Sequence, residues 1–361
     1  MKKTIKLFDP IIDQTEKNAV LKVLNSKFWA SGSGTGNVLE FEKKFKKYTN
    51  SKICIAVNSG TAALNLALSL FDLKNKEVIL PSLSFVSTAN SIIENGGRPV
   101  FIDIEPKTLC LNSEIIEQYI TKKTALILPV HFGGFPCNLK KIHAIAKKYN
   151  LHIVEDAAHA AGTSYNNKKI GKHSDAVCFS FHPVKNLAMP TGGLIAINNS
   201  NYKKFSNLLT SRRWCGITNR KDTHYDVKEL GWNYYMNEFS AAIGLAQLKK
   251  LDKLNRLRQK TCKMYFQKIN TEKKMPFSTD SSYHFYWILV KNQKKFRQKM
   301  LKHGIETGTH YQPIHKMSMY KQKQKLPVTE KVGKTIVTLP TSPNLKSSEI
   351  NYIIESINKS L

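Results

Sequence analysis

Short β-rich runs alternate with segments of helical periodicity over the first two thirds of the chain. This alternation is typical of an α/β domain, in which helices cover a largely parallel sheet on both faces. The pattern therefore predicts three layers: helix, sheet and helix. The strands are expected at residues 53–58, 77–80, 99–104, 125–130, 152–155, 176–181 and 194–197.

The helical segments between these runs gather their apolar residues on one side. Leu139, Ile142, Ala146 and Tyr149 follow one another at i, i+3, i+7 and i+10, a spacing that puts them on a single face of an α-helix. Such a face packs against a sheet because burial removes its apolar surface from water. The sequence therefore predicts a helix over this segment.

The pattern changes near residue 236, where a long helical pattern begins that runs to residue 269. We therefore expect two domains, a large α/β domain at residues 1–245 and a smaller α+β domain at residues 246–361. Beyond the long helix, the pattern predicts strands at 283–290 and 335–339 and helices at 294–303 and from 347 onward.

The net charge of +30 is the one unusual feature of an otherwise ordinary composition of 361 residues. A charge of this size is typical of proteins that bind nucleic acids or anionic membranes. Only seven of the 56 basic residues are Arg, however, although Arg is the better residue for bidentate contacts with phosphates and bases. The lysines are also spread along the whole chain, so we expect neither a nucleic-acid nor a membrane partner. The milder interpretation is that the charge steers an anionic small substrate.

The sequence carries no sign of a membrane span, an export signal or a metal site. No apolar run approaches the roughly 20 residues that cross a bilayer, and the N-terminus lacks the apolar core of a signal peptide. We therefore expect a cytoplasmic protein. The six cysteines lie at least 27 residues apart, without the spacing of zinc ligands, and are predicted to be buried thiols.

The first candidate for chemistry is the turn Asn58-Ser59-Gly60-Thr61, which follows a predicted strand and opens a helix. Backbone N–H groups at a helix N-terminus, aided by Ser and Thr hydroxyls, attract an anion such as phosphate. Taken alone, a Ser or Thr at such a position is more often a simple helix cap. Gly60 and Thr61 thus become candidates for phosphate binding only together with other signals.

The second candidate is the end of the strand at 152–155, where Asp156 and then His159 follow. In open α/β sheets, ligands bind beyond the carboxyl ends of the strands, so Asp156 is placed to meet a cofactor. Capping of the strand end explains Asp156 equally well, and a packed imidazole is the commoner role for His159. Both readings stay open on this segment alone.

The third candidate is Lys185, which lies in an apolar and aromatic setting unlike that of the lysine pairs elsewhere. It follows the segment FSFHPV and precedes the pair Gly192-Gly193. Desolvation lowers the pKa of such an amine and makes it a nucleophile toward a carbonyl. Among 49 lysines, one such position does not by itself separate a reactive lysine from an incidental one.

The order of these signals resembles the fold-type I pyridoxal phosphate (PLP) enzymes: a phosphate-type turn, a strand-end Asp, and Ser180 five residues before Lys185. Within that group, the chain is similar to the DegT/DnrJ/EryC1/StrS family of sugar aminotransferases. The resemblance implies an aspartate aminotransferase-like α/β fold with a mostly parallel sheet in the large domain. It runs almost end to end, through SGTAAL, PSLSFVSTAN, PVHFGG, VEDAAHAAGTSY, FSFHPVKN, GWNYYMNEFSAAIGLAQL and GTHYQPIH.

The resemblance implies a role for each candidate residue. Lys185 would be the catalytic residue, which holds PLP through its amine and moves a proton during the reaction. Asp156 would form a charged hydrogen bond with the pyridinium nitrogen, Phe85 would stack on the ring, and His159 would lie near the ring hydroxyl. Phosphate contacts are implied for Gly60, Thr61, Ser180 and, from a neighbouring subunit, Asn233; contacts with the sugar nucleotide are implied for His182, His310 and Tyr311.

The implied function is that of a PLP-dependent aminotransferase that converts a keto group on a nucleotide-linked hexose or deoxyhexose to an amine. L-Glutamate would be the amino donor, and the product would enter surface glycan or polysaccharide synthesis. The expected contact of Asn233 across subunits implies a homodimer with shared active sites. Two alternatives stay open: a sugar 3-dehydratase or another enzyme of the same fold, and a non-catalytic nucleic-acid-binding protein. A branch of the family that removes a hydroxyl carries histidine in place of the lysine, so Lys185 favours transamination.

Two segments depart from the family pattern. Many members carry an acidic residue before the Gly pair, whereas this chain has Pro190 and Thr191, which leaves that contact open. Residues 211–232 form a longer connection and predict a modified substrate loop. Arg212 or Arg213 within it is a candidate for contact with a pyrophosphate, although a surface cation is the more common role of such a residue.

Overall fold

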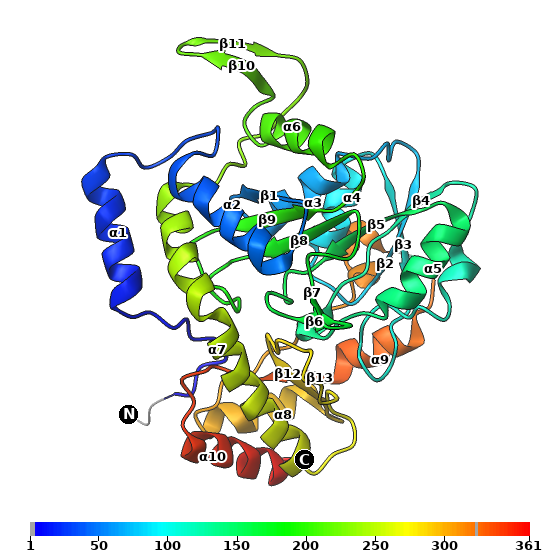
Figure 1. Ribbon diagram of the computed structural model, residues 1–361. Coiled ribbons are helices and arrows are strands. Elements are labelled where there is room, and N and C mark those ends of the chain that lie inside the picture. Colours follow the sequence, from blue (N-terminus) through cyan, green and yellow to red (C-terminus); the bar gives the residue numbers. More distant parts are fainter. Residues whose placement is uncertain (1–3, 322–323) are drawn as a thin grey trace.

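A seven-stranded sheet forms the centre of the molecule (Figure 1). The computed structural model describes residues 4–321 and 324–361. Each strand of the sheet overlaps one of the seven predicted runs. The strands are β1 (Ile53–Val57), β2 (Glu77–Pro81), β3 (Arg98–Ile102), β4 (Thr124–Ile127), β5 (His152–Asp156), β8 (Ala176–Ser180) and β9 (Gly193–Ile197).

The strand order is β1-β9-β8-β5-β4-β2-β3. The pairs β8–β5, β5–β4, β4–β2 and β2–β3 are parallel, and β9 runs antiparallel to both of its neighbours. The parallel strands therefore end at the same edge of the sheet, which is where ligands bind in such folds. The predicted fold class, α/β with a mostly parallel sheet, is confirmed.

Helices cover both faces of the sheet because successive strand side chains point to opposite sides. Cys54 and Ala56 of β1 belong to one buried cluster, together with apolar residues of α2, α5 and α7. Ile55 and Val57 belong to a second cluster, together with residues of α3, α4 and α6. The predicted three layers are thus present. The helices are α2 (Gly36–Thr49), α3 (Gly60–Leu68), α4 (Ser87–Glu94), α5 (Leu139–Tyr149), α6 (Tyr202–Arg212) and α7 (Glu238–Lys268).

The long helix α7 links the sheet to a smaller group of elements at the C-terminal end (Figure 1). There, β12 and β13 pair antiparallel, close to the two predicted strands. The predicted domain boundary near residue 245 falls inside α7, which continues through it, and this boundary stays a prediction. The elements are β12 (Tyr286–Leu289), α8 (Gln293–Lys302), α9 (Pro327–Thr335), β13 (Ile336–Leu339) and α10 (Ser347–Asn358).

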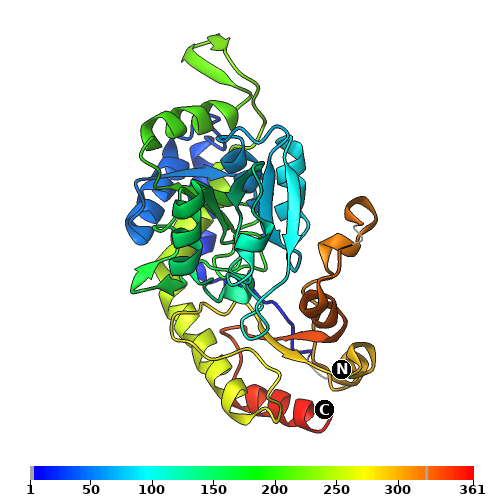
Figure 2. The same ribbon diagram turned by 90° about the vertical axis from the view of Figure 1, so that its right-hand side faces the viewer.

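Several elements escaped the sequence patterns. Helix α1 (Gln14–Ser26) packs against α7 and buries only Glu16 and Val23, so it lacks a long apolar face. It begins at the capping box of Asp13 and Glu16. The hairpin β10–β11 projects away from the body of the molecule (Figures 1 and 2). The remaining strands are β6 (Ser164–Tyr165), β7 (Lys168–Lys169), β10 (Ile217–Lys221) and β11 (His224–Val227), and the short 3-10 turns are Ile116–Tyr119, Phe132–Gly134, Ile314–Lys316 and Ser318–Tyr320.

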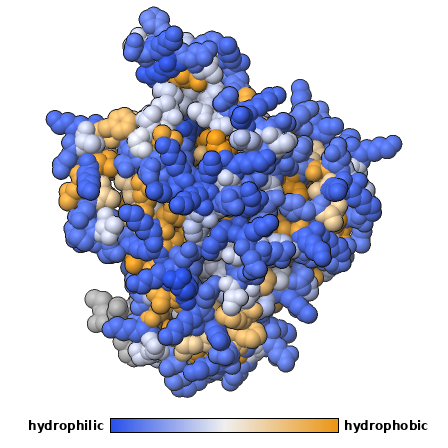
Figure 3. Space-filling view, viewed as in Figure 1, coloured by the Kyte–Doolittle hydropathy of each residue, from blue (hydrophilic) through white to orange (hydrophobic). Residues whose placement is uncertain are grey.

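The face shown in Figure 3 is mostly hydrophilic, with hydrophobic residues in separate spots. This agrees with lysines that are spread along the chain instead of being gathered in one arm. Within the described residues, no helix combines the length and the apolar character that a membrane span requires. Five of the six cysteines are buried thiols as predicted, but Cys215 is exposed, since it lies in the connection that leads to the projecting hairpin.

Candidate active site

A cavity of about 450 Å³ opens where the parallel strands end. Its walls come from segments far apart in the sequence: the turn after β1, the segment after β2, the ends of β5 and β8, and the loop at 310–311. Ten of the eleven predicted site residues line it, all except Asn233. They are Gly60, Thr61, Phe85, Asp156, His159, Ser180, His182, Lys185, His310 and Tyr311.

The turn between β1 and α3 forms one wall and presents a helix N-terminus to the cavity. The Ser59 side chain accepts from the Ala62 N–H at 3.1 Å, and its carbonyl accepts from the Ala63 N–H at 3.0 Å. The N–H groups of Gly60 and Thr61 come before these, where a helix offers no carbonyl partner, so they suit an anion. A Cβ on Gly60 would lie 2.6 Å from the Cβ of Ser180, so the turn packs against β8 only with glycine at this position.

Asp156 ends β5 and is buried at the floor of the cavity. Its carboxylate accepts hydrogen bonds from the Thr88 hydroxyl at 2.8 Å and from the Ala158 N–H at 3.0 Å. Burial raises the pKa of Asp156, while these two hydrogen bonds and the charge of Lys185 act in the opposite direction. A buried carboxylate in this setting gains most from a cationic hydrogen-bond donor in the cavity.

Lys185 sits in a turn after β8 that is closed by a hydrogen bond from its N–H to the His182 carbonyl at 2.8 Å. The next residue, Asn186, anchors this turn, because its side chain donates to Asn255 of α7 and to the Ser282 carbonyl. Burial lowers the pKa of Lys185 to about 8, and the charge of Asp156 limits the fall. At this pKa about a tenth of the amine is unprotonated at pH 7, and the lowered value agrees with the desolvated setting inferred from its neighbours.

The opposite wall is aromatic. His159 Nε2 lies 3.0 Å from the Tyr311 hydroxyl, and their rings are nearly parallel, with centroids 5.9 Å apart. Burial and the charges of Lys185 and His310 lower the pKa of His159 well below its ordinary value. Phe85 stands at the side of Tyr311, and 56% of its surface is exposed, so its ring is free to contact a ligand in the cavity.

Comparison with known proteins identifies the family. The profile described as the DegT/DnrJ/EryC1/StrS aminotransferase family matches residues 10–358. The chain belongs to this family. GDP-perosamine synthase of Escherichia coli O157:H7 is 32% identical over 365 residues, which cover 99% of this chain and 98% of the relative.

Two solved structures of aminotransferases superpose over nearly the whole chain. Helicobacter pylori PseC, an aminotransferase involved in the biosynthesis of pseudoaminic acid, has a TM-score of 0.92 at 29% identity and covers 99% of both chains. The PLP form of a putative sugar aminotransferase from Streptococcus pneumoniae has a TM-score of 0.92 at 26% identity and covers 99% of this chain and 98% of that chain. The resemblance to the family is confirmed.

Asn233 lies outside the cavity of its own chain. It forms an isolated bridge with Trp214, and its carbonyl accepts from the Asn58 side chain at 3.2 Å. Its backbone thus lies near the turn after β1 and close to the base of the projecting hairpin, and Asn233 is not among the residues that line the cavity with Lys185. The role of Asn233 stays a prediction.

The two arginines considered for a pyrophosphate contact have other partners. Arg213 is 2% exposed and pairs with the buried Glu42 at 2.6 Å, so it is neither a surface cation nor free to meet a ligand. Arg212 pairs with Glu229 at 2.8 Å and donates to the Ser69 carbonyl. Both pairs join the segment after α6 to the rest of the molecule, which assigns them a structural role.

Four hydroxyl-bearing residues of the site were missed by the sequence analysis, and only the tertiary structure brings them to the cavity. Ser84, Ser87 and Thr88 lie after β2, and the Ser87 and Thr61 hydroxyls are 2.7 Å apart. The run of Ser and Thr in SLSFVST is the signal that points to them. Thr191, where many family members carry an acid, also lines the cavity, and its hydroxyl donates to the Asn58 carbonyl.

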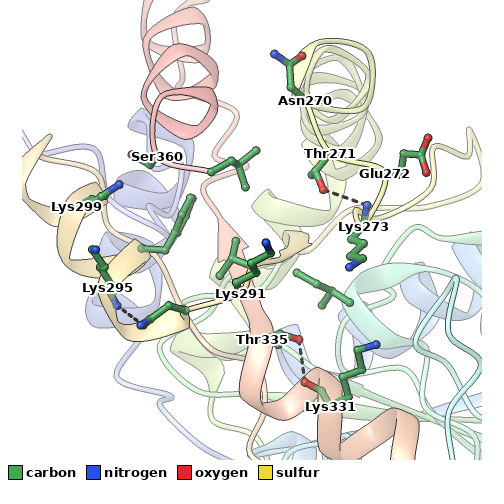
Figure 4. A pocket seen from close by; sticks show the side chains of 15 residues that line it. Asn270, Thr271, Glu272, Lys273, Lys291, Lys295, Lys299, Lys331, Thr335 and Ser360 are labelled. Carbon is green, nitrogen blue, oxygen red and sulfur yellow. Dashed lines mark hydrogen bonds between the residues drawn. The ribbon is translucent and has the colours of Figure 1, made fainter.

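A larger cavity of about 630 Å³ lies in the C-terminal part of the molecule (Figure 4). Its polar lining is dominated by lysines on α8, on α9, in the turn after β12 and in the segment after α7. The described residues place no group of three His, Cys, Asp or Glu side chains where they could hold a metal ion. The lysines of the larger cavity are Lys273, Lys291, Lys295, Lys299 and Lys331. None of the predicted site residues lines this cavity, and ten of them line the smaller one.

Proposed function

We propose that this protein is a cytoplasmic, PLP-dependent aminotransferase that converts the keto group of a nucleotide-linked hexose to an amine, with L-glutamate as the amino donor. The observation that carries the proposal is the convergence of Lys185, Asp156 and the Gly60–Thr61 turn on one cavity, in a chain of a sugar aminotransferase family. Relatives named for GDP-perosamine and pseudoaminic acid synthesis support an amino-sugar product. Such a product would enter surface glycan or polysaccharide synthesis.

The cavity fits PLP by the chemistry of its walls. The free N–H groups of Gly60 and Thr61, with the Ser180 hydroxyl beside them, suit the phosphate. The buried Asp156 suits the protonated ring nitrogen, and the exposed ring of Phe85 suits the face of an aromatic ring. When bound, PLP supplies an electron-accepting ring, which takes up the electron pair left when the hydrogen beside the amino group is removed.

The protein's own contribution centres on Lys185 and Asp156. Because the pKa of Lys185 is lowered to about 8, the side chain exchanges a proton readily near neutral pH, as a general acid and base must. Thr88 and Ala158 fix the orientation of the Asp156 carboxylate, so it need not reorganise when it receives a cationic partner. The contacts with the sugar nucleotide would come from His182 and His310, which line the same cavity.

Both substrates would use the same cavity in turn. Glutamate would give up its amino group and leave as 2-oxoglutarate before the keto-sugar enters. Lys185 would move a proton in both halves of the cycle, because it is the one amine that lines the cavity among the residues of the described chain. The reaction would therefore be ping-pong.

We also propose a homodimer in which each subunit completes the site of the other. Asn233 lies outside its own cavity, near the base of the hairpin β10–β11. The hairpin and the segment after it expose three large apolar residues, Tyr225 at 57%, Val227 at 53% and Leu230 at 79%. Apolar side chains on a projecting arm gain stability when a second copy covers them.

The first experiment is a visible absorption spectrum of the protein with added PLP, before and after L-glutamate. We expect a band of protein-bound PLP that glutamate bleaches. The variant Lys185→Ala forms no such band if the lysine holds the cofactor. A wild-type protein without the band would overturn the enzyme proposal. A band that L-alanine bleaches and L-glutamate does not would overturn the choice of amino donor.

A further inference from the structure

A hydrogen-bond chain behind the cavity ends at the Tyr311 hydroxyl, and its direction can be worked out from the structure. The Gly133 N–H points at His159 Nδ1 at 3.3 Å, and His159 Nε2 lies 3.0 Å from the Tyr311 oxygen. A backbone N–H can only donate, so His159 Nδ1 must accept and carries no proton. This fixes one of the two ring nitrogens without reference to any ligand.

The proton of the ring is then on Nε2. His159 is buried among Lys185, His284, His310 and Tyr311, and burial together with the charges of Lys185 and His310 keeps its ring neutral. A neutral imidazole whose Nδ1 accepts has its proton on Nε2. His159 therefore donates to the Tyr311 oxygen, and the Tyr311 O–H is directed to another acceptor.

The described residues offer no acceptor for this O–H, so we expect its acceptor to be a ligand in the cavity. In the part of the chain that the structure describes, His159 is the one side chain within hydrogen-bonding distance of the Tyr311 hydroxyl, and Tyr311 lines the cavity beside Lys185. Burial, and to a lesser degree the charge of Asp156, raise the pKa of Tyr311, so the phenol keeps its proton. The site thus presents an O–H donor to whatever lies next to Lys185.

Stacked rings hold His159 in this orientation. Phe8 lies on His284 with centroids 5.0 Å apart, His284 lies on His159 at 4.7 Å, and His159 lies beside Tyr311 at 5.9 Å, each pair within 27° of parallel. The His284 N–H also donates to the Gly133 carbonyl at 2.9 Å. His284 therefore supports the ring of His159 and also holds Gly133, the residue whose N–H fixes the tautomer of that ring.

We propose that Tyr311 is the hydrogen-bond donor that recognises the keto oxygen of the sugar, and that His159 and His284 are positioning residues that set its direction. The proposal rests on the proposed function. The keto carbon must lie beside Lys185 if that lysine moves its proton, which brings the oxygen into the same cavity. The amino group of glutamate or of the product is itself a donor and gains nothing from the Tyr311 O–H, so the device favours the keto substrate.

The tautomer is tested on the PLP-loaded enzyme without turnover, by long-range ¹H–¹⁵N spectra of ¹⁵N-histidine protein at pH 7. His159→Gln identifies the His159 signals by their loss. We expect a protonated Nε2 and a bare Nδ1, unchanged between pH 6 and 8. A proton on Nδ1, or a cationic ring, would overturn the proposal whether or not the enzyme turns over a sugar.

The recognition step is tested by comparing the two half-reactions at saturating PLP. Tyr311→Phe keeps the ring and removes the donor, so we expect glutamate bleaching to stay within about twofold and kcat/KM for GDP- and UDP-linked keto-hexoses to fall about tenfold. Equal losses in both half-reactions, or no loss with the sugar, would contradict the role. If neither sugar nucleotide is turned over by the wild type, the proposed substrate class fails while the spectra still decide the hydrogen-bond direction.

Two matched pairs separate positioning from general structural support. The Gln side chain of His159→Gln can accept from the Gly133 N–H and donate to Tyr311, so this variant should retain the sugar half-reaction. His159→Leu can do neither, so its kcat/KM for the sugar nucleotide should fall about tenfold. In the double variant with Tyr311→Phe, His159→Leu should cause no further loss. His284→Phe keeps the stack and His284→Ala removes it, so only the latter should weaken the sugar step. Additive losses in the double variant would show that His159 does not act through Tyr311.

Discussion

At the scale of single residues, the site works by burying or half-burying a few polar groups. Lys185 is the clearest example: burial lowers the pKa of its amine to about 8, and no neighbouring carboxylate fully restores it. Asp156 is held by two donors that leave its charge available to a ligand. Each effect depends on a contact that another segment of the chain supplies.

The lowered pKa of Lys185 predicts how the apoenzyme takes up PLP. Only the unprotonated amine reacts with an aldehyde, so the uptake rate should rise about tenfold per pH unit below a pH of about 8 and level off above it. Stopped-flow absorbance between pH 6 and 9.5 measures this. A profile that keeps rising toward the ordinary lysine pKa would show that the amine is not desolvated, and Lys147→Ala, at an exposed lysine of α5, should leave the profile unchanged.

The hydrogen bond from Thr88 predicts an effect on cofactor affinity. Thr88→Val removes the donor to Asp156 at nearly the same volume, so the carboxylate loses its orientation and the Kd for PLP should rise about tenfold. Equilibrium dialysis gives this constant. Ser91→Ala, which removes a buried hydroxyl of the same helix that bonds to the Ser87 carbonyl, should leave the Kd unchanged. Similar losses in both variants would assign the effect to the helix instead.

At the scale of elements, the connection between α6 and α7 is bonded to the body of the molecule at its start, and its hairpin projects into solvent. Arg213 bonds to Glu42 at 2.6 Å and to the Ala56 and Ser33 carbonyls, which fixes the start of the connection against α2 and β1. The hairpin β10–β11 that follows projects from the body (Figure 2). A rigid base with an exposed arm suits an element that contacts a second subunit.

The buried pair at the base predicts a large effect on stability. Arg213→Ala leaves Glu42 without its cationic partner in an apolar setting, and we expect a loss of about 3–5 kcal/mol in the free energy of unfolding. Urea denaturation followed by circular dichroism measures it. Arg220→Ala, which removes the contact of an exposed guanidinium with the Trp214 ring on the hairpin side, should cost less than about 1 kcal/mol. A small loss at Arg213 would mean that Glu42 is readily protonated or hydrated in the folded protein.

The hairpin predicts which residues hold the dimer together. Tyr225 and Val227 share one side of β11 and His224 and Asp226 the other, because side chains alternate along a strand. Tyr225→Ser with Val227→Ser should shift the protein toward monomer in sedimentation velocity and weaken PLP binding if Asn233 acts across the interface. The matched pair His224→Ser with Asp226→Ser should leave the dimer intact. A wild-type monomer would contradict the shared site.

At the scale of the whole molecule, the charge of +30 surrounds an active site that must admit anions. Lysines line the larger cavity of the C-terminal part (Figure 4), and further lysines cover most helices. Screening by salt weakens interactions between exposed charges beyond a distance of about 8–10 Å at ordinary ionic strength. Any steering of an anionic substrate by this charge is therefore expected to depend on the salt concentration.

This predicts that the apparent affinity for the nucleotide sugar weakens with salt. The KM for the sugar nucleotide should rise several-fold between low and moderate ionic strength, because the approach of a multiply charged anion is screened. Steady-state kinetics in potassium chloride measure it. A KM that does not change with salt would leave the charge without a role in steering. The double variant Lys295→Gln with Lys299→Gln tests whether the lysines of the larger cavity contribute to this salt dependence.

The sequence by itself determined the seven strands of the sheet, the fold class and ten of the residues that line the cavity. The strands, the fold class and the candidates Gly60, Thr61, Asp156, His159 and Lys185 follow from local patterns: alternation of strands and helices, and polar residues at strand ends that a parallel sheet brings to one edge. The other five were implied by the resemblance to the family: Phe85, Ser180, His182, His310 and Tyr311. The structure corrected the exposure of Cys215 and the role of Arg213, since both depend on packing that no local pattern records.

Only the tertiary structure decided which of these residues touch. Thr88 reaches Asp156 across 68 positions, and Tyr311 reaches His159 across 152. Such contacts are set by the packing of whole elements, because a hydrogen bond forms only when two backbones place donor and acceptor within about 3 Å of each other. The sequence therefore named the groups that do the chemistry, and the fold set their protonation, their direction and their partners.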